Sequence, residues 1–276
     1  AARRAQPETP MTQPVLSVRN LEVEFVTRRA TLRAINGVSF DIAKGEVLGM
    51  VGESGAGKSV TGLAVIGLID PPGRISAGEI ELSGRRIDHL PPEEIRRIRG
   101  KRIGMIFQDP LTSLNPLYKI GDQIVETIRT HTDLSESAAR RRAIDLLAEV
   151  GIPAPEKRID GYPHEFSGGM RQRVVIALAI CAEPELIIAD EPTTALDVSV
   201  QAQIINLLQD LQREYGLALI FIAHDLAVVR HISHRVMVMY MGRMMEQADR
   251  EVLFNSPAHP YTKALLASAP SSDLSV

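Results

Sequence analysis

The sequence contains a single cysteine, Cys181, among its 276 residues. One thiol cannot form a disulfide within the chain, and it cannot supply a cysteine cluster for zinc or an iron–sulfur centre. The shortage of cysteine fits a reducing compartment. Cys181 lies in the apolar run 174–182, so we expect it to be a small buried side chain.

Long apolar runs are also lacking. The longest mostly apolar stretches without charge are residues 60–69 and 217–223, well short of the roughly 20 residues that span a bilayer. No secretory signal is recognisable either. Any role at a membrane would therefore have to come through a partner. We expect residues 1–13 to be a disordered leader, with Met11 as the candidate natural start.

An excess of positive charge is the third missing feature. The net charge is −3, which does not indicate a generally basic surface for nucleic acid. Residues 85–102 contain seven arginines or lysines, interrupted by Glu93 and Glu94. We expect this segment to form a solvated face.

The pattern of apolar residues predicts strands that alternate with helices, which favours an α/β fold with a mainly parallel sheet. The expected strands are 15–26, 35–42, 45–51, 77–84, 103–107, 186–189, 218–223 and 235–240. The expected helices are 60–69, 121–129, 135–150, 170–182, 200–215 and 226–232. Apolar positions 139, 143, 146, 147 and 150 repeat with helical spacing. Residues 116–165 are therefore expected to form a helical insertion in the α/β domain.

A glycine-rich segment joins the expected strand 45–51 to the helix 60–69. Gly52, Gly57, Lys58 and Ser59 match the phosphate-binding P-loop pattern G-x-x-x-x-G-K-[ST]. Glycines let backbone N–H groups turn toward phosphates, lysine neutralises the β- and γ-phosphates, and serine ligates Mg²⁺. The alternative is a glycine-rich turn with a chance Lys-Ser pair. The expected nucleotide-binding residues here are Gly52, Glu53, Ser54, Gly55, Ala56, Gly57, Lys58, Ser59 and Val60.

Two further motifs follow in the second half of the chain. Asp190 ends the apolar strand 186–189 and is expected to hold Mg²⁺, while Glu191 can polarise an attacking water. Many strands end in acids, and this pattern gains its meaning from the P-loop before it. Ser167, Gly168 and Gly169 precede the expected helix 170–182. They offer a hydroxyl and unhindered amides at a positive helix end, a second anion site, although an ordinary serine cap with a flexible hinge would look the same.

Together, the P-loop, the Ser-Gly-Gly segment and the Asp190-Glu191 pair resemble the ATP-binding subunit of an ABC transporter over residues 14–270. The resemblance implies a P-loop NTPase (RecA-like) α/β fold with an N-terminal antiparallel β subdomain, in which 14–115 and 166–255 form the ATP-binding core and 116–165 the helical subdomain. It implies further roles for four residues. Gln108 would be the Q-loop glutamine near Mg²⁺, Asp197 the D-loop residue, His224 the switch histidine and Phe25 an adenine-stacking aromatic.

Within this family the chain resembles the dipeptide, oligopeptide and nickel importers, most of all the D subunit of peptide importers. The resemblance rests on residues 107–116, 166–173 and 259–266, the last beginning His259-Pro260-Tyr261. It assigns 256–276 to a C-terminal extension. Phe166 and Met170 stand where the commoner family pattern has Leu and Gln. Some members continue into a cysteine-rich iron–sulfur tail, for which this sequence has no cysteines.

The resemblance implies ATP and Mg²⁺ as cofactors, and a site that two subunits share. Ser59, Gln108 and Asp190 would hold the metal, while Lys58, Gln108, Glu191 and His224 would carry catalysis. Ser167 would serve the nucleotide of the other subunit. The implied partners are a second ATP-binding subunit, usually a different one although a homodimer is chemically open, two transmembrane permease subunits and, indirectly, an extracytoplasmic solute-binding protein. The implied location is the cytoplasmic face of the cell membrane, with no nucleic-acid partner.

Two alternatives remain open at this point. The same ATPase could serve an importer of nickel or another small solute, because this subunit does not touch the solute. A soluble ATPase of the same fold could act in DNA repair or on ribosomes, although such proteins usually carry coiled coils, zinc modules or two fused cassettes. A generic P-loop kinase would leave Ser167 and His224 unexplained.

Overall fold

The computed structural model describes residues 13–194 and 196–268. The expected leader, apart from Gln13, and the expected tail 270–276 lie outside these residues. The first half contains β1 (Leu16–Val26), β2 (Thr31–Ile42), β3 (Val47–Val51), α1 (Lys58–Val65), β4 (Gly73–Leu82), β5 (Arg85–Arg86), α2 (Pro92–Ile98), β6 (Ile103–Ile106), α3 (Pro110–Ser113), α4 (Ile120–His131) and α5 (Glu136–Glu149). The second half contains α6 (Pro155–Arg158), η1 (Pro163–Glu165), α7 (Gly168–Ile180), β7 (Leu186–Asp190), α8 (Val198–Tyr215), β8 (Ala218–Ile222), α9 (Leu226–Ile232), β9 (Arg235–Tyr240), β10 (Arg243–Asp249), α10 (Arg250–Asn255) and α11 (Pro260–Ser268).

Two sheets form the core of the molecule. The larger has six strands in the order β10-β9-β3-β8-β7-β6, all parallel except β10, which runs antiparallel to β9. The smaller has four strands in the order β2-β1-β4-β5, all antiparallel. The expected mainly parallel sheet and the N-terminal antiparallel β sheet are both confirmed.

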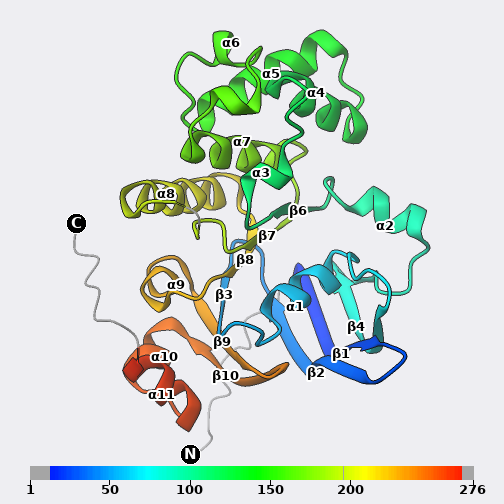
Figure 1. Cartoon of the computed structure of the whole chain (residues 1–276), viewed down its shortest axis with the longest axis vertical. Coiled ribbons are helices and arrows are strands. Elements are labelled where there is room, and N and C mark those ends of the chain that lie inside the picture. The colour runs from blue at the N-terminus through cyan, green and yellow to red at the C-terminus, as the bar shows by residue number, and fades with distance from the viewer. Residues whose placement is uncertain (1–12, 195, 269–276) are drawn as a thin grey trace, which may run out of the picture.

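The central strands of the large sheet are buried on both faces, as is typical of parallel sheets. Every residue of β3, β7 and β8 is buried, because helices and the second sheet cover both faces. Leu48 and Met50 point into a cluster shared with α1 and the four-stranded sheet. Val47 and Val51, on the opposite face, belong to a cluster shared with α7, α8 and α9. Figure 1 shows the four-stranded sheet and α8 on different sides of these strands.

The helical insertion lies beyond α7 and α8 in Figure 1. Ala139, Ala143, Leu146 and Leu147 of α5 are fully buried, as is Val150, so the predicted apolar face of this helix is confirmed. It packs with α4 and α7. In the part of the chain that the structure describes, no helix has the length and apolarity to cross a membrane.

Some predicted boundaries were wrong. The helix expected over 60–69 is α1, which ends at Val65, because Gly67 adopts a left-handed φ of 71° and the chain turns. Helix α8 begins earlier than expected, at Val198, because Asp197 caps it by accepting a hydrogen bond from the Val200 N–H at 3.0 Å. The strands β5 and β10, the helices α2, α3, α6, α10 and α11, and the short helix η1 were not predicted.

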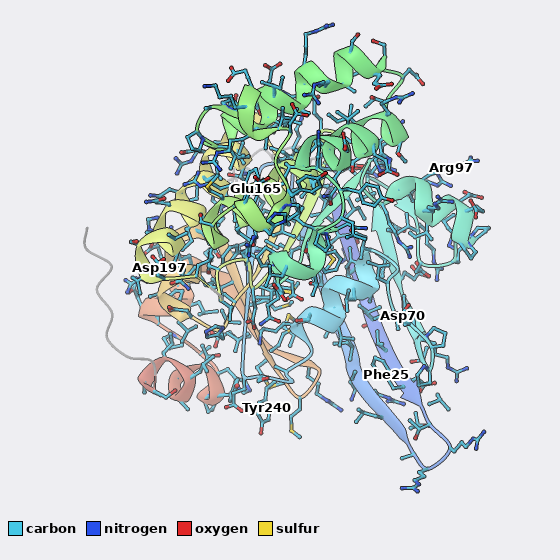
Figure 2. All side chains as sticks on the ribbon, turned by 45° about the horizontal axis from the view of Figure 1, so that its top comes forward. Phe25, Asp70, Arg97, Glu165, Asp197 and Tyr240 are labelled. Carbon is cyan, nitrogen blue, oxygen red and sulfur yellow. The ribbon has the colours of Figure 1, made fainter. Side chains whose placement is uncertain are left out.

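The basic segment 85–102 is largely paired within the chain. Arg85 contacts Glu94 at 2.6 Å, and Arg86 contacts Asp88 at 3.0 Å. Arg99 donates a hydrogen bond to the Ile66 carbonyl at 3.0 Å. Arg97, by contrast, projects away from the body of the molecule in Figure 2. The expected solvated face is therefore real, but several of its charges are neutralised by local partners.

Cys181 should be unreactive in the folded protein. It is 4% exposed, and burial raises the pKa of its thiol to about 12. Since the thiolate is the reactive form, we expect iodoacetamide to label the native protein at least roughly 100-fold more slowly than the urea-unfolded protein. In S137C, a cysteine on the exposed side of α5 provides the control and should be labelled at once. Equal labelling of native and unfolded wild-type protein would contradict the buried position.

Candidate nucleotide-binding site

The glycine-rich loop connects β3 to α1, as predicted. Gly52, Gly55 and Gly57 have φ angles of 150°, 78° and 101°, which lie in the region that glycine adopts at little cost. A Cβ on Gly52 would lie 2.2 Å from the main-chain oxygen of Met239. Glycine is therefore required at Gly52 by close packing as well as by its backbone angle.

Lys58 folds back over this loop. Its Nζ donates hydrogen bonds to the Gly52 carbonyl at 2.8 Å and the Glu53 carbonyl at 3.1 Å, and the residue is 5% exposed. Burial lowers the pKa of Lys58, while the nearby Glu191 and Asp190 carboxylates oppose this shift. The loop thus holds a desolvated ammonium group ready for an anion.

Ser59 and Asp190 meet beside the lysine. The Ser59 hydroxyl donates a hydrogen bond to Oδ1 of Asp190 at 2.9 Å. Asp190 is the last residue of β7 and is 9% exposed. Burial raises the pKa of Asp190; the Ser59 hydrogen bond opposes this shift, and Glu191 adds to it. A buried carboxylate next to a second acid is a favourable place for a cation.

Glu191 is the point at which the other predicted side chains converge. Its Oε2 accepts hydrogen bonds from Gln108 Nε2 at 3.1 Å and from Thr194 Oγ1 at 2.9 Å. His224 Nδ1 lies 3.4 Å from the same oxygen. Among the described residues, no donor reaches Oε1. Glu191 also has a left-handed φ of 48° and donates its N–H to the Ile222 carbonyl at 2.9 Å. Such a backbone is unfavourable for a residue with a side chain and is typical of functional sites.

The sheet order brings these groups together. The strands β3, β8, β7 and β6 are parallel neighbours, so their carboxyl ends share one edge of the sheet. The P-loop, His224, the Asp190-Glu191 pair and Gln108 follow these four strands in that spatial order. This edge is where open α/β sheets bind ligands.

Thr194 was missed by the sequence analysis. The segment Glu191-Pro-Thr-Thr194 contains two threonines. Their hydroxyls, so close to Glu191 in the sequence, were the available signal. Thr193 is 6% exposed, and its carbonyl accepts a hydrogen bond from Gln201. Only the folded backbone shows that Thr194 is the residue that bonds Glu191.

Ser167, Gly168, Gly169 and Asp197 form a second group. The Ser167 hydroxyl accepts a hydrogen bond from the Met170 N–H at 3.3 Å and so caps α7. A Cβ on Gly169 would lie 2.6 Å from Val200 Cγ1, which places the starts of α7 and α8 against each other. Hydrogen bonds from the Val200 N–H and the Ser199 hydroxyl lower the pKa of Asp197. Among the described residues, no hydrogen bond or ion pair joins this group to the P-loop.

Phe25 packs among apolar residues at the edge of the core. It is half-buried on β1, and its Cε1 would be 2.7 Å from a Cβ on Gly73. It belongs to the edge of the core cluster that also includes Val60, the last of the expected P-loop residues. Figure 2 shows it on the four-stranded sheet. Its role as an adenine-stacking aromatic stays a prediction.

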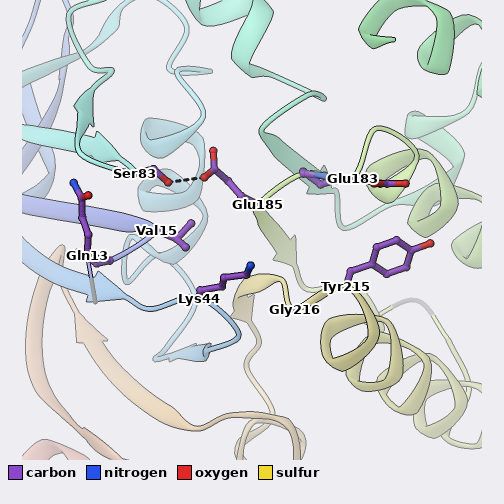
Figure 3. A pocket seen from close by; sticks show the side chains of 10 residues that line it. Gln13, Val15, Lys44, Ser83, Glu183, Glu185, Tyr215 and Gly216 are labelled. Atoms are coloured by element: carbon purple, nitrogen blue, oxygen red, sulfur yellow. Dashed lines mark hydrogen bonds between the residues drawn. The ribbon is translucent and has the colours of Figure 1, made fainter. Parts of the chain in front are cut away.

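A cavity of about 410 Å³ lies elsewhere, between the two sheets. Lys44, Ser83, Glu185 and Tyr215 are among its lining residues, and Figure 3 shows the hydrogen bond from Ser83 to Glu185 across it. Since Glu185 directly precedes β7 and Gly216 shortly precedes β8, the cavity is at the amino ends of these strands. It contains none of the predicted site residues.

Comparison with known proteins agrees with this geometry. The family model described as "ABC transporter" matches residues 35–194. The chain belongs to the ABC transporter family. A second model, "Oligopeptide/dipeptide transporter, C-terminal region", matches residues 245–274 of this ABC cassette. Membership of the family implies that the cassette binds ATP.

Curated relatives and solved structures give the same result. The cassette is 51% identical to the dipeptide transport ATP-binding protein DppD of Escherichia coli, covering 93% of this chain and 78% of that protein. It is 53% identical to the oligopeptide transport ATP-binding protein OppD of Bacillus subtilis, with coverages of 93% and 72%. A dimeric ATP-binding cassette bound to ADP and Pi is similar with a TM-score of 0.75 and 28% identity, covering 85% of this chain and 98% of that one. The structure of cbiO1 from Clostridium perfringens gives a TM-score of 0.76 and 29% identity, with coverages of 89% and 92%. The expected P-loop NTPase fold is thus confirmed.

Proposed function

We propose that this chain is the ATP-hydrolysing subunit of an ABC transporter that imports di- or oligopeptides. The observation that carries the proposal is the convergence of Gln108, Thr194 and His224 on Glu191, beside the P-loop. It occurs in a chain that is about half identical to ATP-binding proteins of dipeptide and oligopeptide transport. Its C-terminal region matches the model named for that class of transporter.

Different residues of this chain have different roles in ATP hydrolysis. Lys58 and the amides of the P-loop bind the phosphates of ATP. Glu191 accepts a proton from the attacking water through Oε1, which accepts no hydrogen bond from the described residues, since Oε2 already accepts from Gln108 and Thr194. His224 lies beside Oε2 and donates toward the γ-phosphate. Held in this way, the base needs little rearrangement when the water is in place.

The residues present also fit Mg²⁺. Asp190 and Ser59 offer a carboxylate and a hydroxyl in direct contact, and Mg²⁺ is usually held by one or two carboxylates together with substrate phosphates. The raised pKa of Asp190 reflects a buried negative charge without full compensation, which a cation would relieve. Gln108 is the third expected ligand. When bound, the ion would neutralise charge on the phosphates.

The second group completes the site of another subunit. Ser167 and the amides of Gly168 and Gly169 lie at the exposed start of α7, where a helix end favours an anion. No hydrogen bond or ion pair joins this group to the P-loop within the described residues. We therefore infer that it faces the ATP of a second cassette, so that closure of two subunits is needed for hydrolysis. Asp197, which caps α8 against the same group, lies at this interface.

The wider assembly follows from the same proposal. The cassette pairs with a second ATP-binding subunit, of the same or a different kind, at the cytoplasmic face of the membrane. It couples to two permease subunits and indirectly to an extracytoplasmic solute-binding protein. Residues 14–115 and 166–255 form the ATP-binding core, 116–165 the helical subdomain and 256–276 the C-terminal extension.

Reconstituted transport tests the solute. The chain would be co-expressed with the permease, second ATPase and binding-protein genes beside its own, and placed in proteoliposomes. We expect ATP-dependent uptake of labelled di- or oligopeptides that stops in K58A, because the variant loses the ammonium group at the phosphates. Uptake of Ni²⁺ without any peptide would contradict the peptide assignment. Co-purification with nucleic acid instead of permease subunits would contradict transport altogether.

A further inference from the structure

The C-terminal segment packs on β10 and on Tyr240, beside the β9–β10 turn that bonds the P-loop, a contact that the proposed mechanism does not use. Its start is fixed to β10. Glu246 Oε1 accepts a hydrogen bond from the Ala258 N–H at 2.8 Å, and its Oε2 accepts one from the His259 N–H at 3.0 Å. The His259 Nδ1 then accepts from the Tyr261 N–H at 3.1 Å. These bonds set the position of Tyr261 at the start of α11.

The Tyr261 ring rests on the end of β9. Its centroid lies 4.6 Å from that of Tyr240, with 43° between the ring planes, a tilted arrangement that aromatic pairs favour. Tyr240 is labelled in Figure 2. Tyr240 is followed by the turn into β10, and Gly242 of this turn donates its N–H to the Ala56 carbonyl at 3.0 Å. The P-loop is thus hydrogen-bonded to the β9–β10 turn, and this turn directly follows Tyr240, on which the Tyr261 ring packs.

The Tyr261 hydroxyl is the second link. It is buried, and among the described residues none forms a hydrogen bond of good geometry with it. Burial raises the pKa of Tyr261; the main-chain N–H of Glu53 lowers it, and the Glu53 carboxylate raises it. Glu53 of the P-loop therefore lies close enough to this hydroxyl to influence it. A buried polar group without a partner calls for an explanation, such as a role in another state of the protein.

We propose that Tyr261 is a positioning residue for the P-loop. Its ring supports the β9–β10 turn through Tyr240, and its hydroxyl forms a hydrogen bond with Glu53 when the loop closes on nucleotide phosphates. The C-terminal segment is then part of the nucleotide site, where it tunes affinity for ATP. This inference rests on the proposed function as an ATPase.

The test removes the hydroxyl and keeps the ring. In Y261F we expect the Kd for ATP of the isolated chain, measured by calorimetry, to rise about fivefold, the effect of one hydrogen bond. The KM for ATP of the reconstituted transporter should rise in parallel while kcat stays within about twofold, because Glu191 and its partners are untouched. The thermal midpoint without nucleotide should not fall, since the lost hydroxyl had no partner.

The matched control is Y162F, which removes the hydroxyl of an exposed tyrosine within the helical insertion and should leave the Kd unchanged. An unchanged Kd in Y261F would overturn the proposal. So would a lower thermal midpoint with a normal Kd, since that result assigns Tyr261 to stability alone. If the wild-type chain bound no ATP, the proposed function itself would fail, so the two failures are distinguishable.

Discussion

Replacing Glu191 by glutamine should slow ATP hydrolysis by roughly 10²- to 10⁴-fold, the usual contribution of a general base, while ATP still binds. The glutamine has nearly the shape of the glutamate, so the loop between β7 and α8 should keep its course. It cannot accept a proton from water at neutral pH. Because ATP then persists at the site, the closed pair of cassettes should accumulate.

Hydrolysis and binding are measured separately in this experiment. Phosphate release gives the rate, calorimetry gives the Kd, and gel filtration with ATP shows the dimer. E214Q, on an exposed part of α8, is the matched control and should behave like the wild type. Turnover of E191Q near the wild-type rate would show that Glu191 is not the base.

Replacing Ser167 by arginine should abolish hydrolysis at the partner's nucleotide and leave the subunit's own ATP binding intact. The arginine removes the cap hydroxyl that now bonds the Met170 N–H and places a bulky cation where the phosphates of the other subunit would dock. The P-loop shares no hydrogen bond or ion pair with this group among the described residues. We therefore expect a normal Kd and a rate at least roughly 100-fold lower.

A second serine provides a close control. Ser135 caps α5 as Ser167 caps α7, by accepting a main-chain hydrogen bond, but it lies on the helical insertion. S135R should lose a similar cap without losing activity. If the chain pairs with itself, mixing S167R with E191Q should restore hydrolysis, because each mixed dimer contains one intact site. Loss of ATP binding in S167R alone would refute the shared site.

Much of the candidate site could be located from short segments. Gly52, Lys58 and Ser59 lie within a few residues of each other, and the apolar strand and helix on either side identify the loop. Asp190 could be placed at the end of β7 because a run of apolar residues stops there. In both cases the relevant spacing is local, so periodicity and glycine content are sufficient.

Contacts between distant segments could not be predicted in this way. The hydrogen bond from Gln108 to Glu191 depends on β6 and β7 being neighbours in the sheet. The sequence of neither strand indicates which strand will lie beside it. The strand β10 escaped prediction because its residues are at least partly exposed and do not alternate clearly; pairing with β9 makes it a strand. The contact between Tyr261 and Tyr240 likewise depends on the fold, so the sequence could not link Tyr261 to the P-loop.

The order of strands in the large sheet has a consequence for synthesis of the chain. β8 lies between β3 and β7 but leaves the ribosome after both. Until residues 218–222 emerge, the P-loop and Asp190 cannot be held at their final spacing, and ATP has no formed site with which to stabilise the nascent chain. The edges of two apolar strands stay unpaired during this interval. The unfinished chain is therefore most prone to aggregate just before its central strand arrives.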